Sequence, residues 1–165
     1  RMALRGIEPE IRYNFYGDVN KYPISFKPSK TPHVWMCAHA KYGGELQAGL
    51  DMIERIAPSL SDITFHIYGI YQTTKNQNVV YHGLVPEEQM DKEIKNYQGA
   101  IRLHYFDGFS EVISKAILLV QYVFSKINYP FVVSNDIYGF LRGLRDITEA
   151  NIRARLYYLK ELRKL

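Results

Sequence analysis

Short runs of apolar and β-branched residues alternate along the chain with segments in which apolar residues recur every three or four positions. The strand-like runs occupy residues 33–38, 63–69, 79–83, 100–104, 122–125 and 131–134. The helix-like segments occupy residues 46–56, 86–97, 108–120, 137–144 and 152–162. Alternation of this kind is typical of βαβ units, which build a parallel sheet with helices on both faces. We therefore predict an α/β fold with about six parallel strands.

The first 32 residues do not share this pattern. Four prolines interrupt them, and Gly17-Asp18 is a turn signal. We predict an irregular N-terminal segment over residues 1–32, with at most one short strand. A single domain follows over residues 33–165 and includes the C-terminal helix. At 165 residues, the chain is long enough to bury a core of ordinary size.

Composition narrows the class of protein. Apolar residues make up 47% of the chain and charged residues 23%, which excludes a disordered chain or a collagen-like repeat. The net charge of +4 allows an anionic partner without requiring one. The single cysteine, Cys37, rules out an intramolecular disulfide and favours a reducing cytoplasm. No histidine pair has H-x-x-x-H or H-E-x-x-H spacing, so we expect no metal site, and His66 and His82 inside strands are expected to be structural.

In open parallel sheets, ligands bind at the carboxyl ends of strands, beside helix N-termini. The loops that follow predicted strands cover residues 39–44, 70–77, 83–87 and 104–110. The first contains Gly43 and Gly44, whose backbone N–H groups can approach an anion, with His39 or Lys41 adding charge. The same residues also suit a plain strand-to-helix turn. His104 ends the fourth predicted strand, where a site is expected.

The loop between the fourth predicted strand and the helix that follows it contains an acidic residue. Asp107 precedes Gly108, Phe109 and Ser110, where the helix begins, and on chemistry alone it is a helix cap. Lys115, one to two turns further, is on its own a surface lysine. These residues gain a sharper meaning only from the resemblance described below.

The turn at Gly83, Leu84 and Val85 can present backbone groups to a flat base, or can simply link a strand to a helix. The polar loop at residues 70–77 contains one cation, Lys75, and no specific signal.

Basic and aromatic residues gather in the last predicted helix, which contains Arg153 and Lys160. Such a helix could contact nucleic acid or an acidic membrane surface. We favour instead a solvated helix that packs Ile152, Leu156 and Leu159 onto the domain.

Two stretches of the chain resemble a known enzyme class. Residues 78–90 read NVVYHGLVPEEQM and residues 97–116 read YQGAIRLHYFDGFSEVISKA, and both resemble retaining glycosyltransferases of the two-domain GT-B type. The chain is most similar to family 4, which includes mannosyl- and glucosyltransferases. The resemblance spans residues 33–146 and is carried by the order and spacing of the loops. It implies a Rossmann-like domain, the GT-B half that binds the nucleotide-sugar donor.

Carried over position by position, the resemblance gives Asp107 the catalytic role of orienting the donor sugar. The residues that it implies for donor binding are His39, Lys41, Gly43, Gly44, Gly83, Leu84, Val85, His104, Gly108, Phe109, Ser110 and Lys115. Lys115 and Val120 depart from the family, which has a glutamate and a glycine there. The glutamate is expected to accept hydrogen bonds from the ribose. Because lysine has only donors, Lys115 either meets a phosphate or leaves the site impaired.

The resemblance implies transfer of a sugar from a nucleotide sugar to an acceptor, without a metal or other cofactor. Helix N-termini and cations would stabilise the charge that builds on the departing diphosphate. The acceptor would bind to an N-terminal domain or a separate subunit, so we expect the chain to be inactive alone. The alternative is a non-catalytic Rossmann-like partner module derived from a glycosyltransferase. Nucleic acid is not expected as a partner, and peripheral membrane contact stays open.

Overall fold

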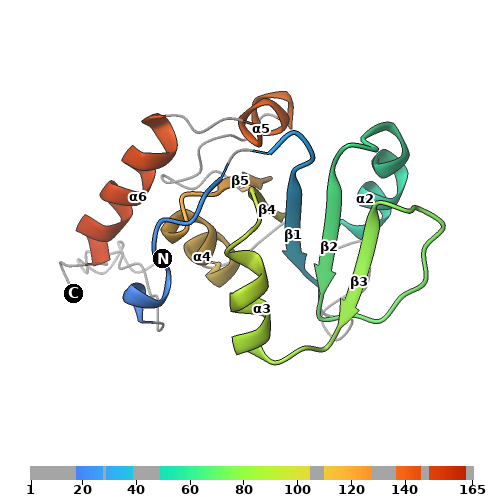
Figure 1. Ribbon diagram of the computed structural model, residues 1–165, viewed down its shortest axis with the longest axis horizontal. Helices are drawn as coiled ribbons and strands as arrows, with labels where there is room; N and C mark the ends of the chain where they lie inside the picture. Colours follow the sequence, from blue (N-terminus) through green and yellow to red (C-terminus); the bar gives the residue numbers. More distant parts are fainter. Residues whose placement is uncertain are drawn as a thin grey trace, which may run out of the picture.

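A five-stranded parallel sheet forms the centre of the computed structural model (Figure 1). The structure describes residues 18–27, 29–38, 49–104, 110–127, 137–145 and 149–162. The strands are β1 (His33–Cys37), β2 (Thr64–Tyr68), β3 (Val79–Gly83), β4 (Gly99–Arg102) and β5 (Tyr122–Ser125). Every strand pair in the sheet is parallel. The predicted α/β class is confirmed, and the sixth predicted strand, at 131–134, lies outside the described residues.

The strands follow the order β3-β2-β1-β4-β5 across the sheet. The chain builds outward from β1 on one side, then crosses back to place β4 against the other side of β1. The strand order therefore reverses between β1 and β4. In parallel sheets with helices on both faces, this reversal leaves a crevice at the carboxyl ends of the two strands.

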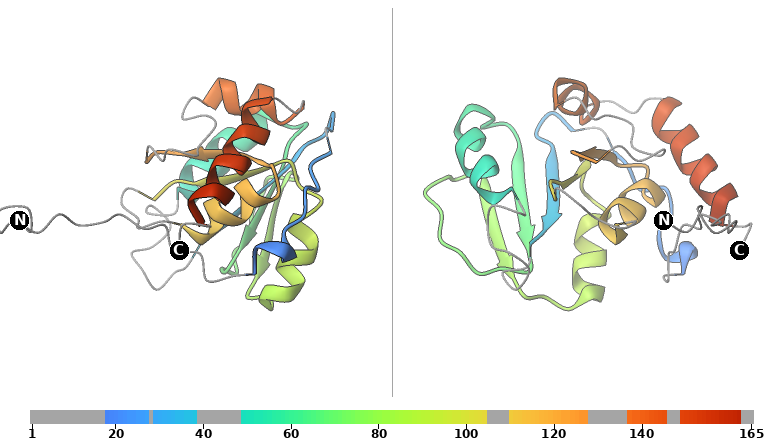
Figure 2. Two further views of the ribbon diagram at one scale, coloured as in Figure 1. Left: turned by 90° about the vertical axis from the view of Figure 1, so that its left-hand side faces the viewer. Right: turned by 180° about the vertical axis from the view of Figure 1, so that it is seen from behind.

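Helices cover both faces of the sheet (Figure 2). They are α2 (Leu50–Ile56), α3 (Glu87–Ile94), α4 (Glu111–Leu118), α5 (Ile137–Gly143) and α6 (Glu149–Leu162), with short 3-10 turns η2 (Val19–Lys21) and η4 (Ala57–Ser59). Within the described ranges, no helix combines the length and apolar character needed to cross a membrane.

Alternation along β1 shows how the sheet divides the core. Val34 and Met36 point into a cluster with residues of α2 and α5. Trp35, between them, points into a second cluster with residues of α3, α4 and α6. Successive side chains of a strand face opposite sides, so a strand buried on both faces is apolar throughout. This is why the β1 sequence reads as a continuous apolar run.

The packing of α6 agrees with the prediction at Leu159 and differs from it at Leu156. Tyr158 is fully buried, whereas Leu156 is 61% exposed, so the expected packing of Leu156 onto the domain is wrong. The Tyr158 hydroxyl donates a hydrogen bond to Ser114 Oγ on α4, over 2.9 Å. A tyrosine can be buried when its hydroxyl finds such a partner, and α4 supplies one beneath Tyr158.

The described part of the N-terminal segment packs onto the domain. Tyr22 is buried in the cluster formed by α3, α4 and α6. Its hydroxyl donates to Asp91 Oδ2 at 2.8 Å, and its backbone carbonyl accepts from Arg155 Nη1 at 3.0 Å. Phe26 lies in the cluster on the opposite face of the sheet. The segment therefore wraps an edge of the sheet and contributes to both cores.

Candidate functional site

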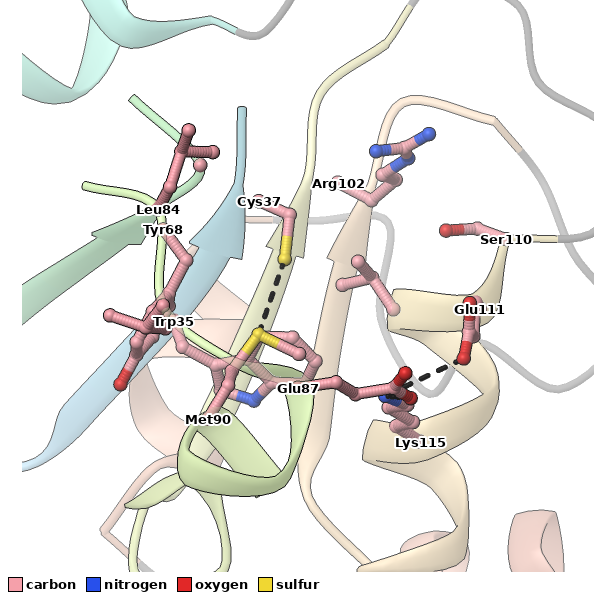
Figure 3. Close-up of a pocket in the computed structure, with 13 residues that line it drawn as sticks. Trp35, Cys37, Tyr68, Leu84, Glu87, Met90, Arg102, Ser110, Glu111 and Lys115 are labelled. Carbon is pink, nitrogen blue, oxygen red and sulfur yellow. Dashed lines mark hydrogen bonds and ion pairs between the residues drawn. The ribbon is translucent and has the colours of Figure 1, made fainter. Parts of the chain in front are cut away.

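A cavity of about 400 Å³ opens at the carboxyl ends of the strands, at the reversal between β1 and β4 (Figure 3). Side chains from β1, β2 and β4 meet the first turns of α3 and α4 there. Its lining consists of Trp35, Cys37, Tyr68, Gly69, Leu84, Val85, Glu87, Met90, Arg102, Ser110, Glu111, Val112 and Lys115. The cavity thus lies where the predicted topology places a ligand site.

The inner wall of the cavity is apolar and fixed in place. Trp35 is fully buried, and its indole Nε1 donates a hydrogen bond to Gln121 Oε1 over 2.8 Å. Cys37 Sγ lies 3.8 Å from Met90 Sδ. Burial raises the pKa of the Cys37 thiol to about 11, so Cys37 is a neutral apolar contact at pH 7 and not a nucleophile.

Lys115 is held by three carboxylates. Its Nζ lies 2.7 Å from Glu87 Oε1, 3.0 Å from Asp91 Oδ1 and 3.5 Å from Glu111 Oε1. The side chain is only 3% exposed. Burial opposes the charge of Lys115, but hydrogen bonds to Glu87 and Asp91 outweigh it and raise its pKa. Lys115 therefore stays charged and joins α4 to α3.

The lysine is outnumbered by its acidic partners, so this side of the cavity is negatively charged. The side chains of Glu87 and Glu111 are 65% and 64% exposed and line the cavity. The hydrogen bond from Lys115 lowers the pKa of Glu87, which keeps that carboxylate ionised at neutral pH. An ionised carboxylate accepts hydrogen bonds, so this wall suits a ligand with hydroxyl groups.

The opposite charge lies at the end of β4. Arg102 lines the cavity, and Figure 3 shows its guanidinium on the same side as Ser110, apart from the Lys115 cluster. Ser110 occupies the N-cap position of α4, is 4% exposed and makes no side-chain capping bond. A guanidinium beside a helix N-terminus suits an anionic group such as a phosphate.

The turn after β3 forms the far rim. Gly83 has φ of +69°, a conformation that residues with side chains rarely adopt. Leu84 and Val85 follow it and line the cavity. Leu84 is 69% exposed. This rim lies on the β3 side of the sheet, across β1 from Arg102.

A row of three histidines runs across the neighbouring strands β1, β2 and β3. His33 Nδ1 lies 2.8 Å from His66 Nε2, and His66 Nδ1 lies 2.9 Å from His82 Nε2. Burial lowers the pKa of all three, that of His66 to about 4, so they are neutral at pH 7. As expected from the sequence, His66 and His82 are hydrogen-bonded residues within the sheet. Tyr68, in the cavity wall, donates to Glu93 Oε2 on α3 over 2.6 Å.

The structure brings four of the residues expected to bind a donor to this cavity, and Gly83 directly precedes two of them. The four are Leu84, Val85, Ser110 and Lys115. His104 follows β4 and does not line the cavity. The remaining candidates, which lie outside the described residues, are His39, Lys41, Gly43, Gly44, Asp107, Gly108 and Phe109.

Sequence reasoning missed several groups that form the site. The sequence analysis did not single out Glu87 or Glu111, which lie in the first turns of α3 and α4. Arg102 is the one charged residue in β4, and a charge inside an otherwise buried strand was the signal that could have identified it. Among the described residues, no cluster of histidine, cysteine or acidic side chains is arranged to hold a metal ion.

Comparisons with known proteins show which solved structures share this fold. No family model and no curated protein matches the sequence. Among solved structures, a crystal structure of TarM is 14% identical, with a TM-score of 0.61, over 81% of this chain and 32% of TarM. The lipopolysaccharide outer core galactosyltransferase WaaB, in its apo form, is 15% identical, with a TM-score of 0.59, over 93% of this chain and 52% of WaaB.

A mutant of TarM from S. aureus, solved with fondaparinux, α-GlcNAc-glycerol and UDP, is also similar. It is 13% identical, with a TM-score of 0.64, over 95% of this chain and 38% of that protein. The three structures are glycosyltransferases of the GT-B type. This chain spans about a third to a half of their length. Its fold is therefore a Rossmann-like domain of the kind found in GT-B glycosyltransferases.

Proposed function

We propose that this chain binds a nucleoside diphosphate sugar and acts as the donor-binding half of a glycosyltransferase. The observation that carries the proposal is the cavity at the β1/β4 reversal, in a fold shared with TarM and WaaB. The cavity combines a cation, a carboxylate wall and an apolar floor. These are the groups that a ligand made of phosphates, sugar hydroxyls and a flat base requires.

Arg102 is the residue that we assign to the diphosphate. Its guanidinium can donate two hydrogen bonds to phosphate oxygens at once. Ser110 lies on the same side of the cavity (Figure 3), and its hydroxyl and the first N–H groups of α4 would add donors without a metal ion. During transfer, this group of donors would stabilise the negative charge that develops on the departing diphosphate.

Glu87 and Glu111 are assigned to hydroxyl groups of the ribose or the sugar. Both carboxylates line the cavity and are mostly exposed. Lys115 donates a hydrogen bond to Glu87 and so positions that carboxylate to accept a hydrogen bond from the ligand. The charge of Lys115 is balanced by the carboxylates around it. Lys115 therefore contributes less to phosphate binding than Arg102 in this proposal.

Transfer would need an acceptor-binding partner, because this chain matches only part of its structural neighbours. An N-terminal domain or a separate subunit would supply it. The cytoplasmic location expected from the single cysteine belongs to the same proposal, since nucleotide sugars must reach the cavity.

A non-catalytic binding module is the second candidate. The observation that favours this candidate is Lys115. The resemblance expects a glutamate at this position, but the chain has a lysine that pairs with three carboxylates. Such a module would still bind a nucleotide in the cavity. It would fail to transfer a sugar when an acceptor-binding partner is added.

Isothermal titration calorimetry of the whole chain with UDP, GDP and ADP, and with their sugars, tests the proposal. We expect binding of at least one of them, and Arg102→Gln should weaken it by tenfold or more, about 1.5 kcal/mol for a lost charge-assisted hydrogen bond.

Arg145→Gln is the matched control. Arg145 is exposed, pairs with Asp62 and does not line the cavity, so its loss should leave the affinity unchanged. Absence of heat with every nucleotide, at high protein concentration, would contradict donor binding. An equal loss of affinity in both variants would reject the role of Arg102 alone.

A further inference from the structure

Helix α6 presents two large apolar side chains to solvent. Leu156 is 61% exposed and Tyr157 is 51% exposed. Arg153 lies one turn before them and Lys160 one turn after them, and both are exposed as well. Residues at positions i, i+3, i+4 and i+7 share one face of a helix, so these four residues form a single stripe, here called the outer stripe of α6.

The other side of α6 is anchored to the domain, which fixes the direction of the outer stripe. Tyr158 is fully buried and donates to Ser114 Oγ on α4, and Leu159 packs against the same core. Arg155 Nη1 donates to the Tyr22 carbonyl over 3.0 Å. Figure 1 shows α6 on the outer side of α4, with the sheet on the other side of α4. The outer stripe therefore faces away from the core, and its residues are not among those that line the cavity.

The exposure of Leu156 changes the interpretation of this helix. The preference for an ordinary solvated helix rests on Leu156 packing onto the domain, and the structure places this side chain in solvent. Leu156 and Tyr157 are adjacent in the sequence, so their exposed apolar groups lie near each other. Apolar groups gathered in this way indicate a contact surface.

The surrounding charge indicates what this surface contacts. Arg153 and Lys160 flank the apolar pair and are about 10 Å apart along the helix axis. Residues 151–165 contain five basic residues and one acidic residue, in a chain of net charge +4, which favours an anionic partner. A nucleic-acid backbone would pair with the cations and leave Leu156 exposed. An anionic bilayer would use the whole stripe: Leu156 enters the acyl boundary, Tyr157 lies at the headgroup level, and the cations contact lipid phosphates.

We propose that the outer stripe of α6 docks the chain on the surface of an anionic lipid bilayer. Helix α6 has 14 residues and would lie parallel to the bilayer without crossing it. A small apolar patch with few cations gives a reversible attachment, which requires anionic lipid and weakens as salt screens the charges. The docking surface is separate from the cavity, so this inference goes beyond the proposed function and does not depend on it.

Co-sedimentation of the whole chain with lipid vesicles tests the inference. The vesicles consist of phosphatidylcholine, either alone or mixed with phosphatidylserine. We expect binding to the mixed vesicles at low salt and little binding to phosphatidylcholine alone. Leu156→Gln and Lys160→Glu should each lower the partition coefficient by about tenfold, because the first removes the inserted side chain and the second reverses a charge.

Two residues of the loop after β2 supply the matched controls. Tyr71→Gln removes an apolar side chain that is 73% exposed, and Lys75→Glu reverses an exposed charge. This loop and α6 lie on opposite sides of the molecule (Figure 1). Each control should leave the partition coefficient within about twofold of that of the unchanged chain, because salt screens charges that are far from the docking surface.

The outcomes decide between docking on lipid and other uses of the stripe. Absence of binding to the mixed vesicles at low salt would overturn the inference. An equal loss in Lys75→Glu and Lys160→Glu would also overturn it, since net charge alone would then attract the chain. Binding to a short DNA duplex with the same dependence on Leu156 would assign the stripe to nucleic acid instead. A lower thermal unfolding midpoint of Leu156→Gln would assign Leu156 to the fold.

Calorimetry with UDP separates this inference from the proposed function. Leu156→Gln should bind UDP as tightly as the unchanged chain does, because Leu156 is not part of the cavity wall. A chain that binds the mixed vesicles through α6 but binds no nucleotide would contradict the proposed function and support the docking surface.

Discussion

Lys115 shows how the role of one residue depends on partners that are distant in the sequence. Glu87 and Asp91 lie 28 and 24 residues before it and reach it only because α3 and α4 pack side by side. Its position seven residues after Gly108 matched a family glutamate, and its charge suggested a phosphate contact. In the structure the ammonium is buried and is offset by a group of carboxylates, so the expectation of a surface lysine is wrong, whereas the phosphate contact stays a prediction.

Replacing Lys115 should therefore destabilise the fold. Lys115→Met should lower the free energy of unfolding by about 2 kcal/mol, because half-buried Asp91 loses its cation. Lys115→Glu, which installs the residue of the resembled family, should cost more, because it adds a fourth carboxylate to three others. Urea unfolding measures both.

Lys92→Met is the control for these variants. Lys92 lies on α3, next to Asp91, but is exposed, so its loss should change the free energy of unfolding by less than about 0.5 kcal/mol. If Lys115→Glu were as stable as the unchanged chain, the carboxylate cluster would not be the environment of Lys115.

The sequence could identify Leu84, Val85 and Ser110 because each follows a recognisable strand or begins a helix. It could not identify Arg102 as a cavity residue, because that depends on β4 lying beside β1 and not beside β3. Nor could it indicate the contact between Gly83 and Tyr71, since residues 72–78 between Tyr71 and β3 form a loop whose path no local pattern specifies. Both features depend on how separate elements pack against one another, which the local sequence does not specify.

At the scale of elements, the histidine row joins three strands to α3. One arrangement of protons satisfies the row: His33 donates to His66, His66 donates to His82, and His82 faces the Glu93 carboxylate at 3.8 Å. Each imidazole then needs only one proton. The row is therefore neutral and ends on a carboxylate that the hydrogen bond from Tyr68 keeps ionised by lowering its pKa.

Two tyrosines, Tyr97 and Tyr68, contact the residues of the histidine row. The Tyr97 hydroxyl lies 3.2 Å from His66 Nδ1 and 3.1 Å from the Tyr68 hydroxyl, which donates to Glu93. The rings of His66 and Tyr97 stack with centroids 4.3 Å apart. An added proton on His66 would enter a buried position between two other histidines, where burial and the neighbouring imidazoles disfavour it.

This arrangement predicts acid sensitivity with a defined sign. The pKa of His66 is about 4 in the folded chain and 6.5 when unfolded, so its contribution to stability is present above pH 6.5 and lost as the pH falls toward 4. The free energy of unfolding should decrease by about 3 kcal/mol over that interval from His66 alone. His33 and His82 act in the same direction.

Thermal unfolding measured from pH 7.5 to pH 4 checks this expectation. His66→Gln should flatten the decrease, whereas His104→Gln, outside the row, should retain it. A stability that stays constant between pH 6.5 and pH 4.5 would contradict the neutral row. A decrease in this interval is assigned to the histidines, because the contribution of carboxylates such as Glu93 is lost mainly at lower pH.

Strand positions were the part of the fold that the sequence predicted well. Residues 79–83 and 122–125 are strands with the predicted bounds, because each is a short apolar run followed by a glycine or a polar turn. Helix ends were less accurate: α3 ends at Ile94, three residues before Tyr97. On α6, the packing of Leu159 was predicted correctly and that of Leu156 was not, because Tyr158 is buried instead, with its hydroxyl bonded to Ser114 Oγ.

At the scale of the whole molecule, the strand order creates the site. Only the crossing from β3 to β4 places Arg102 on one side of β1 and the Gly83 turn on the other. The cavity between them has a cationic end, an acidic wall and an apolar rim. A ligand with a phosphate end and a flat end fits this polarity in one direction only. The donor half of a glycosyltransferase is the function that this polarity supports best.

The location of the bound nucleotide is the central claim, and a titration of the isotope-labelled chain with UDP and GDP by amide NMR tests it directly. Binding of either should move the amide signals of Gly69, Leu84, Arg102 and Ser110 together. The signals of Asp62 and Arg145, which do not line the cavity, should stay in place. Saturating shifts confined to residues away from the β1/β4 reversal, or no shifts with either nucleotide, would contradict the account.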